Sequence, residues 1–315
     1  MAQLSSQADP PTDPPTGQQA ARAGRPFTSA LLVLSGASLF GTVGTAQALG
    51  PDVPAGSLAA TRLLLTAVVF VLVAVATGQG AGIRPALRTA PAWLAGLGQG
   101  AFNLFFLAAM KETGVAIGTL VAIGATPVLT GLIARHVSRL WLGATAVAVA
   151  GLALLVTGQQ DGAATASGAG VALALGAAAS YATYIVAGNA AEARGTPTQP
   201  FLAAAFTVSA LLTLPWLLVG DLGWVTGGGG LVLGYLVAVP TVLAYSLFNR
   251  GLRGVRSSTA STLALVEPVV AASLAYLLLG ERLGATGLVG AAMILLGLLL
   301  IVRSTASPEK TSGPA

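Results

Sequence analysis

The chain has 315 residues, of which 55% are apolar and only 8% are charged, whereas about a quarter of the residues of an ordinary soluble domain carry a charge. This composition excludes a soluble globular protein and predicts an all-α integral membrane protein. The formal net charge of +5 does not indicate a nucleic-acid partner, because the basic residues lie between apolar runs. The sequence contains no cysteine, which excludes disulfides, thiolate metal sites and thiol nucleophiles.

Ten apolar runs follow one another along the chain, each close to the roughly 20 residues that cross a bilayer as a helix. Their approximate limits are 27–49, 56–77, 91–110, 114–134, 140–157, 169–188, 200–219, 230–249, 257–279 and 283–302. Polar residues 1–26 and 304–315 predict disordered tails. The first run has an alternative as a cleaved signal, because Ala46-Gln47-Ala48 resembles a processing site, but its length favours a membrane span.

The basic residues sort to alternate loops. With the N-terminus placed in the cytoplasm, the outer loops hold only Lys111 and Arg282. The cytoplasmic segments hold Arg22, Arg25, Arg84, Arg88, Arg135, Arg139, Arg194, Arg250, Arg253, Arg256, Arg303 and Lys310. Because Lys and Arg collect on the cytoplasmic side of short loops, this pattern predicts ten spans in the cell (inner) membrane with both termini cytoplasmic.

The sequence repeats itself at an offset of about 140 residues. Residues 125–156 align without a gap to residues 266–297, which places Pro127 on Pro268, and the segment from Gly36 falls on the segment from Gly176. Two halves of five helices must enter the membrane from opposite sides, as inverted repeats of transporters do. We therefore predict five-helix repeats over 27–158 and 168–303 around a central cavity. The alternative is that helices rich in Ala, Gly and Leu resemble one another by composition alone.

The stretch EPVVAASLAYLLLGERLGATGLVGAAMILLGLLL, which begins at Glu267, resembles the EamA domains of the drug/metabolite transporter (DMT) superfamily, as does the proline-centred fourth helix of each half. The resemblance covers essentially all of residues 27–302, and LGERLG is its most specific part. The first half departs from it, since residues 135–139 (RHVSR) stand where the second half has Gly280-Glu281-Arg282. The resemblance implies a ten-helix export carrier for metabolites such as amino acids, without identifying the cargo.

Glu267 is the first candidate for a functional role. About 15 Å of helix separate it from Ser257, at the start of its run, so it is predicted near the membrane midplane, where a charged side chain costs about 2.5–3.5 kcal/mol on insertion scales. The adjacent Pro268 is expected to free the carbonyl of Ala264 as an acceptor. We predict that Glu267 binds a substrate ammonium group or a coupling proton. The alternative is a structural partner for a hydroxyl or amide of another helix.

Arg62 is the second candidate, about 9 Å from the outer surface along its helix. It either snorkels to the outer headgroups, pairs with Glu267, or binds a substrate carboxylate. Arg62 and Glu267 together would hold a zwitterion such as an amino acid.

Further polar residues recur on single helical faces. Such stripes commonly hold helices together, but the EamA resemblance implies that the first and third helices of each half line the cavity. The predicted substrate site therefore also includes Thr42, Gln99, Asn103, Tyr181, Tyr184, Tyr245 and Asn249. The aromatic faces of the tyrosines suit an ammonium group. The predicted hinges are Pro127, Pro240 and Pro268, and Trp141, Trp216 and Trp224 are predicted as interfacial anchors.

Other chemistries find no support in the sequence. The single histidine, His136, cannot build a His-based metal site or a Ser-His-Asp triad, and the glycine-rich stretch TGGGG at 226–230 lacks the Gly-Lys-Ser/Thr of a nucleotide loop. We expect no enzyme, metal or cofactor. The expected function is secondary-active or facilitative export of small metabolites, amino acids foremost, by alternating access. The alternatives are efflux of lipophilic cations or drugs by proton antiport, and a membrane sensor or scaffold that transports nothing. No sequence feature specifies an oligomeric state.

Overall fold

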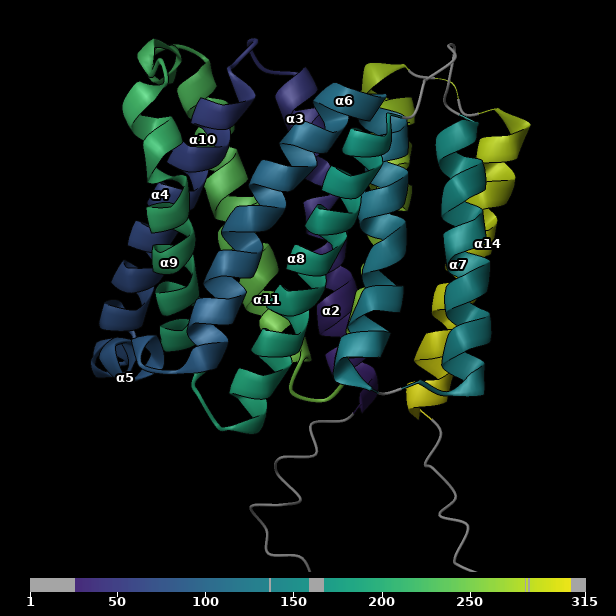
Figure 1. The fold of residues 1–315 in the computed structure, drawn as a ribbon, viewed down its shortest axis with the longest axis horizontal. Coiled ribbons are helices and arrows are strands. Elements are labelled where there is room, and N and C mark those ends of the chain that lie inside the picture. The colour runs from purple at the N-terminus through teal and green to yellow at the C-terminus, as the bar shows by residue number, and fades with distance from the viewer. Residues whose placement is uncertain (1–25, 136, 159–166, 281, 283, 307–315) are drawn as a thin grey trace, which may run out of the picture.

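The computed structural model describes residues 26–135, 137–158, 167–280, 282 and 284–306, and every regular element within them is a helix (Figure 1). In chain order the elements are α2 (Pro26–Phe40), α3 (Thr42–Ala48), α4 (Ala55–Ala76), η1 (Gly80–Gly82), α5 (Ile83–Leu87), α6 (Ala90–Ala134), α7 (Arg139–Thr157), α8 (Gly168–Ala193), α9 (Thr198–Val219), η2 (Gly223–Thr226), α10 (Gly229–Val237), η3 (Ala238–Leu243), α11 (Ala244–Gly251), α12 (Ser257–Leu263), α13 (Val266–Leu274), η4 (Ala275–Leu279) and α14 (Ala285–Ala306). The predicted tails at 1–25 and 307–315 lie outside the described residues, as do His136 and Glu281.

Within the described residues, ten segments are long and apolar enough to cross a membrane. They are Pro26–Ala48, Ala55–Ala76, Ala90–Gly114, Ile117–Ala134, Arg139–Thr157, Gly168–Ala193, Thr198–Val219, Gly229–Gly251, Ser257–Leu279 and Ala285–Ser304. Every limit lies within about five residues of the predicted one, because the length of an apolar run follows directly from the thickness of the hydrocarbon core. The all-α membrane fold is thereby confirmed.

The described basic residues divide between the two ends of the bundle. The first residue of α2 and the last residue of α14 lie at the same end (Figure 1). This end, called here the arginine-rich end, carries Arg84, Arg88, Arg135, Arg139, Arg194, Arg250, Arg253, Arg256 and Arg303. The opposite end carries Lys111, Arg282 and the connection between α3 and α4.

The helices pair in a pattern that relates one half of the chain to the other. The second span (α4) packs along the seventh (α9), and the fifth (α7) along the tenth (α14). The first span (α2) packs along the eighth (α11), and α6, which holds the third and fourth spans, along the sixth (α8). If each span of one half is exchanged for the corresponding span of the other half, the same pairs result. A two-fold relation between the halves requires this. The repeats at 27–158 and 168–303 remain a prediction, which this pairing supports.

Several spans are interrupted near the centre of the bundle. The first span breaks at Gly41, between α2 and α3, and the ninth breaks at Ala264 and Leu265, between α12 and α13. The eighth span passes through a π-helical stretch, η3, which contains Pro240. A proline lacks an N–H and clashes with the preceding turn, which accounts for the irregularities at Pro240 and next to Pro268. Pro127, in contrast, lies within the helical part of α6.

Trp141 is not the interfacial anchor that its position near a span end predicted. It is buried, and its Nε1 donates to the Ser258 carbonyl at 2.9 Å and to Thr262 Oγ1 at 3.1 Å. The Thr145 and Thr262 hydroxyls lie 2.9 Å apart beside it. Trp141 therefore ties α7 to α12, because a neighbouring helix supplies the polar partner that an interface would otherwise provide.

Candidate functional site

A cavity of about 520 Å³ extends into the bundle from the end opposite the arginine-rich end. It begins at the α3–α4 connection, where Gly50 and Asp52 line it, and reaches Tyr245 and Glu267 deep in the bundle. Its volume lies in the range of about 300–1,000 Å³ that is usual for small-molecule sites. Lining residues come from α3, α4, α6, α8, α11 and α13 among others, so both predicted halves contribute to its wall.

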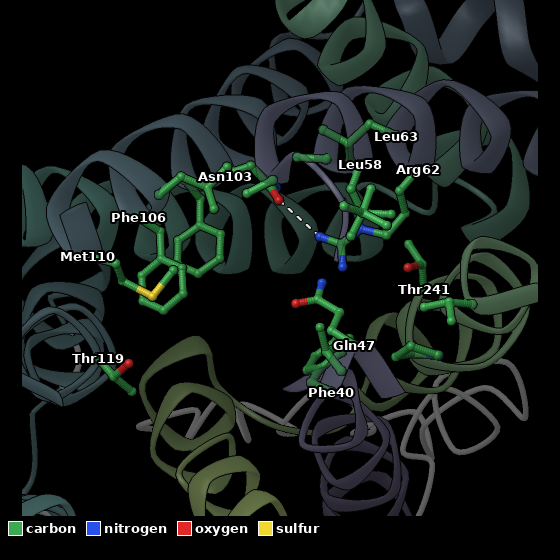
Figure 2. A pocket seen from close by; sticks show the side chains of 18 of the residues that line it. Phe40, Gln47, Leu58, Arg62, Leu63, Asn103, Phe106, Met110, Thr119 and Thr241 are labelled. Carbon is green, nitrogen blue, oxygen red and sulfur yellow. Dashed lines mark hydrogen bonds between the residues drawn. The ribbon is translucent and has the colours of Figure 1, made fainter. Parts of the chain in front are cut away.

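Arg62 projects from α4 into this cavity (Figure 2). Its Nη2 donates to Asn103 Oδ1 at 3.0 Å, and Asn103 Nδ2 donates to the Gln99 carbonyl at 2.9 Å. A guanidinium has five N–H donors, and among the described residues only Asn103 accepts from one of them. The Gln47 side chain points toward the same guanidinium from α3 (Figure 2). The side chain is thus turned inward, held by α6, with donors left over for an anionic group.

Glu267 lies in the first turn of α13, directly after the break in the ninth span. A negative charge is favoured there by the helix dipole. Within the described part of the chain, the carboxylate makes no hydrogen bond or ion pair. The pairing with Arg62, one of the three alternatives considered for that side chain, is therefore not formed. The carboxylate of Glu267 therefore faces the cavity without a partner from the described residues.

The Ala264 carbonyl is not the free acceptor that Pro268 was predicted to create. It accepts a hydrogen bond from the Glu267 N–H at 3.0 Å, because the chain tightens into a turn that satisfies the carbonyl at the helix break. The break of the first span packs against this point. A Cβ at Gly41 would lie only 2.6 Å from the Glu267 carbonyl oxygen, so only glycine fits. Two interrupted spans thus meet at Glu267, an arrangement found at the sites of secondary transporters.

Aromatic rings surround the deep part of the cavity. Phe40 lies 4.8 Å from Tyr245, and Phe102 lies 5.2 Å from Tyr181, between ring centroids. Tyr245 lines the cavity together with Arg62 and Glu267. The Tyr181 hydroxyl is buried and has no hydrogen-bond partner among the described residues. A carboxylate in a cavity lined by aromatic rings provides a favourable environment for an ammonium group.

Comparison with known proteins shows the family. The EamA-like transporter family matches residues 168–303. The chain is 35% identical over 291 residues to the uncharacterized transporter YwfM of Bacillus subtilis, covering 89% of this chain and 94% of the relative. The chain belongs to the EamA-like transporter family. The resemblance to EamA domains of the DMT superfamily is thereby confirmed, and the chain is a multi-pass membrane transporter.

Other relatives of this EamA-like transporter carry more specific names. The threonine/homoserine exporter RhtA of Escherichia coli K12 is 31% identical over 265 residues, which cover 80% of this chain and 83% of the relative. A solved structure titled "Crystal structure of protein" superposes with a TM-score of 0.75 at 21% sequence identity, covering 89% of this chain and 99% of the other. That likeness shows that the helical fold is shared.

The structure brings together most, but not all, of the predicted site residues of the transporter. Arg62, Gln99, Asn103, Tyr181, Tyr245 and Glu267 all line the cavity. Tyr184 and Asn249 do not line it; they are buried and hydrogen-bonded to each other, with Asn249 Nδ2 donating to the Tyr184 hydroxyl. Thr42 donates to the Leu39 carbonyl at 2.8 Å and likewise does not line the cavity. In this structure these three side chains have hydrogen-bond partners in their own or a neighbouring helix, and their role in the substrate site stays a prediction.

Residues that sequence reasoning did not assign to the site also line the cavity. Phe106 and Met110 continue the face of α6 that carries Gln99 and Asn103, at spacings of three and four residues. Their helical spacing from Asn103 could therefore have placed them in the cavity wall, but apolar residues in an apolar helix do not stand out as site residues. Phe40 and Gln47, seven residues apart in the first span, also line the cavity, and neither was assigned to the site from the sequence. The hinge roles of Pro127, Pro240 and Pro268 remain predictions.

Proposed function

We propose that this transporter exports amino acids or closely related small metabolites by alternating access. The observation that carries the proposal is one cavity that contains an unpaired carboxylate, Glu267, and a guanidinium with unused donors, Arg62, on different helices. A zwitterion placed between them compensates both charges. Neither side chain then remains desolvated without a partner, which is the costly arrangement inside a membrane.

The orientation of the substrate follows from the side chains that surround Glu267 and Arg62. The substrate ammonium group lies against Glu267 and the rings of Tyr181 and Tyr245, while the carboxylate lies against Arg62, which Asn103 orients. Arg–carboxylate pairing gives directional, charge-assisted hydrogen bonds. The threonine/homoserine exporter among the relatives agrees with an amino-acid cargo.

A second candidate is efflux of lipophilic cations or drugs by proton antiport. The rings of Phe102 and Phe106 in the cavity wall favour it. Arg62 opposes it, because a fixed positive charge in the same cavity repels a cation that brings no carboxylate. The amino-acid proposal is therefore preferred.

The arginine-rich end is assigned to the cytoplasm of a cell membrane by the positive-inside rule, which places both termini inside. The cavity then opens to the exterior, so that this conformation is the one that releases cargo or admits a coupling proton. The two five-helix halves would rock about Pro127, Pro240 and Pro268 to expose Glu267 to the cytoplasm. No chemical step, metal or cofactor enters this cycle.

Reconstitution in liposomes tests the proposal. Vesicles loaded with mixed amino acids are assayed for efflux with wild-type protein and Glu267→Gln, with and without an imposed pH gradient. We expect efflux that falls at least 10-fold in the variant, and a gradient-stimulated component if the proton is the coupling ion. Gradient-independent efflux that survives the substitution makes Glu267 structural. Efflux of cationic dyes but not of amino acids supports the second candidate, and binding without flux of either supports a sensor or scaffold.

A further inference from the structure

The cavity has two chemically different regions, which lie apart in Figure 2. Arg62, Asn103 and Gln47 gather in one region, and Phe106 and Met110 lie in the other, with Thr119 nearby. Leu107 and Ile123 add to the apolar lining. The charged lining residues are Asp52, at the α3–α4 connection, Arg62 and Glu267. The lining residues of this second region, Phe106, Leu107, Met110, Thr119 and Ile123, carry no charge.

An aromatic row connects the apolar region to the proposed ammonium site. Phe106 stacks on Phe102 with ring centroids 5.3 Å apart and planes at 14°. Phe102 in turn contacts Tyr181, with ring centroids 5.2 Å apart, and Tyr181 lines the same cavity as Glu267. A molecule held at Glu267 and Arg62 therefore has an apolar wall beside it, to which a side chain of the substrate can extend.

We propose that Phe102, Phe106 and Met110 form a subsite for the substrate side chain, which makes this transporter selective for amino acids with uncharged, apolar side chains. This inference rests on the amino-acid export proposed above. Apolar surface gains free energy on leaving water, whereas a hydroxyl group in an apolar subsite loses its hydrogen bonds to water. Valine and norvaline should therefore be exported better than threonine and homoserine, although a threonine/homoserine exporter is among the relatives.

Two isosteric pairs test the subsite. Valine differs from threonine, and norvaline from homoserine, by a methyl group in place of a hydroxyl group. Each of the four amino acids is loaded separately into proteoliposomes at equal concentration, and initial efflux gives kcat/KM. We expect the apolar member of each pair to be favoured about 10-fold or more, the range usual for an apolar pocket that meets an added hydroxyl group.

A matched pair of variants locates the selectivity. Phe106→Ala removes a ring from the wall, and Phe105→Ala removes a ring from the neighbouring position, which is 40% exposed and does not line the cavity. The norvaline-to-homoserine ratio should fall at least 3-fold in Phe106→Ala and remain unchanged in Phe105→Ala. Retained homoserine efflux in Phe106→Ala shows that the variant is folded, and Phe106→Leu provides a milder replacement if it is not.

The outcomes separate the inference from the proposed function. If threonine and homoserine leave as fast as valine and norvaline, or if Phe105→Ala changes the ratio as much as Phe106→Ala, the apolar subsite is contradicted while amino-acid export stands. Thr119 would then be the group to examine as a partner for the substrate hydroxyl. If none of the four leaves the vesicles and the full amino-acid mixture is also retained, the proposed function fails together with the subsite.

Discussion

The first and eighth spans are in close contact at one end of the bundle and line the cavity at the other end. Toward the arginine-rich end, α2 and α11 touch through their backbones: a Cβ at Gly36 would lie 2.6 Å from the Ala244 carbonyl oxygen, and one at Gly251 would lie 2.6 Å from the Ser29 carbonyl oxygen. Toward the opposite end, Val43 and Gln47 of α3 and Val232 of α10 line the cavity instead. One end is closed by main chain, and the other is lined by side chains.

The closed end is also filled with aromatic rings. Phe248 is fully buried and lies 5.9 Å from Phe40, and Phe206 packs edge-on against Tyr245 at 5.0 Å. A solute at Glu267 therefore has access to the open end only. Under the alternating access proposed above, this is the conformation that is open at the end opposite the arginine-rich end, and the second conformation would separate α2 from α11.

Replacement of Gly36 by leucine should have the largest effect on the closed end. The added side chain has no room between α2 and α11, and overpacking of this kind costs about 1–3 kcal/mol, so transport should fall about 10- to 100-fold. Gly44→Leu is the matched control, because a Cβ at Gly44 meets no atom within 4 Å. The measurement is efflux from proteoliposomes, with size-exclusion chromatography to verify folding.

The same variant changes the accessibility of the closed end. The chain lacks cysteine, so Ser29→Cys, at a buried position of α2, introduces a single thiol at the contact. An impermeant thiol reagent applied from the arginine-rich side should label it slowly in the Gly36 background and quickly with Gly36→Leu. Wild-type transport together with unchanged protection would show that the glycine contact is not a gate.

Loss of the Asn103 side chain should have an intermediate effect. Asn103→Leu removes the hydrogen bond that orients Arg62, and a hydrogen bond to a charged group contributes about 1.5–3 kcal/mol, so KM should rise about 10-fold with little change in kcat. Ser209→Ala provides the control, since Ser209 is buried and donates to the Gly96 carbonyl away from the cavity. Equal KM changes in both variants would attribute the effect to general destabilisation.

The smallest effect is expected at the surface of the closed end. Arg253 Nε lies 2.8 Å from Glu192 Oε2, and its Nη2 donates to Thr198 Oγ1 at 2.7 Å, which ties α8, α9 and the α11–α12 connection together. The Arg253 side chain is half exposed, whereas that of Glu192 is buried. Because glutamine at position 253 keeps an N–H donor for the carboxylate and the exposed side of the pair contributes little, Arg253→Gln should raise the rate of thiol labelling at position 29 at most about 5-fold. Arg250→Gln, at an exposed arginine on the same end, should leave the rate unchanged.

A structural feature can be predicted from this sequence where a residue differs in polarity or charge from the residues around it. The spans are predictable because apolar runs stand out against polar connections, and Arg62 and Glu267 because charge stands out against lipid-soluble neighbours. Phe106 and Met110 escape notice because cavity-facing and lipid-facing apolar residues look the same in the sequence. Tyr184 and Asn249 illustrate a different point, since a polar stripe on one helix does not reveal whether another helix already supplies its hydrogen-bond partners.

In the proposed substrate site, Glu267 and Arg62 hold the two charges of one zwitterion. The most direct test compares transport of the best-exported amino acid with its amide, which lacks the carboxylate, and with its N-acetyl derivative, which lacks the ammonium group. Wild-type protein should reject both derivatives about 10-fold or more. Arg62→Gln should lose discrimination against the amide alone, and Glu267→Gln should lose discrimination against the N-acetyl derivative alone. If both derivatives are exported as well as the parent amino acid, or if each variant changes both ratios alike, the two residues do not bind opposite ends of the substrate and the account is wrong.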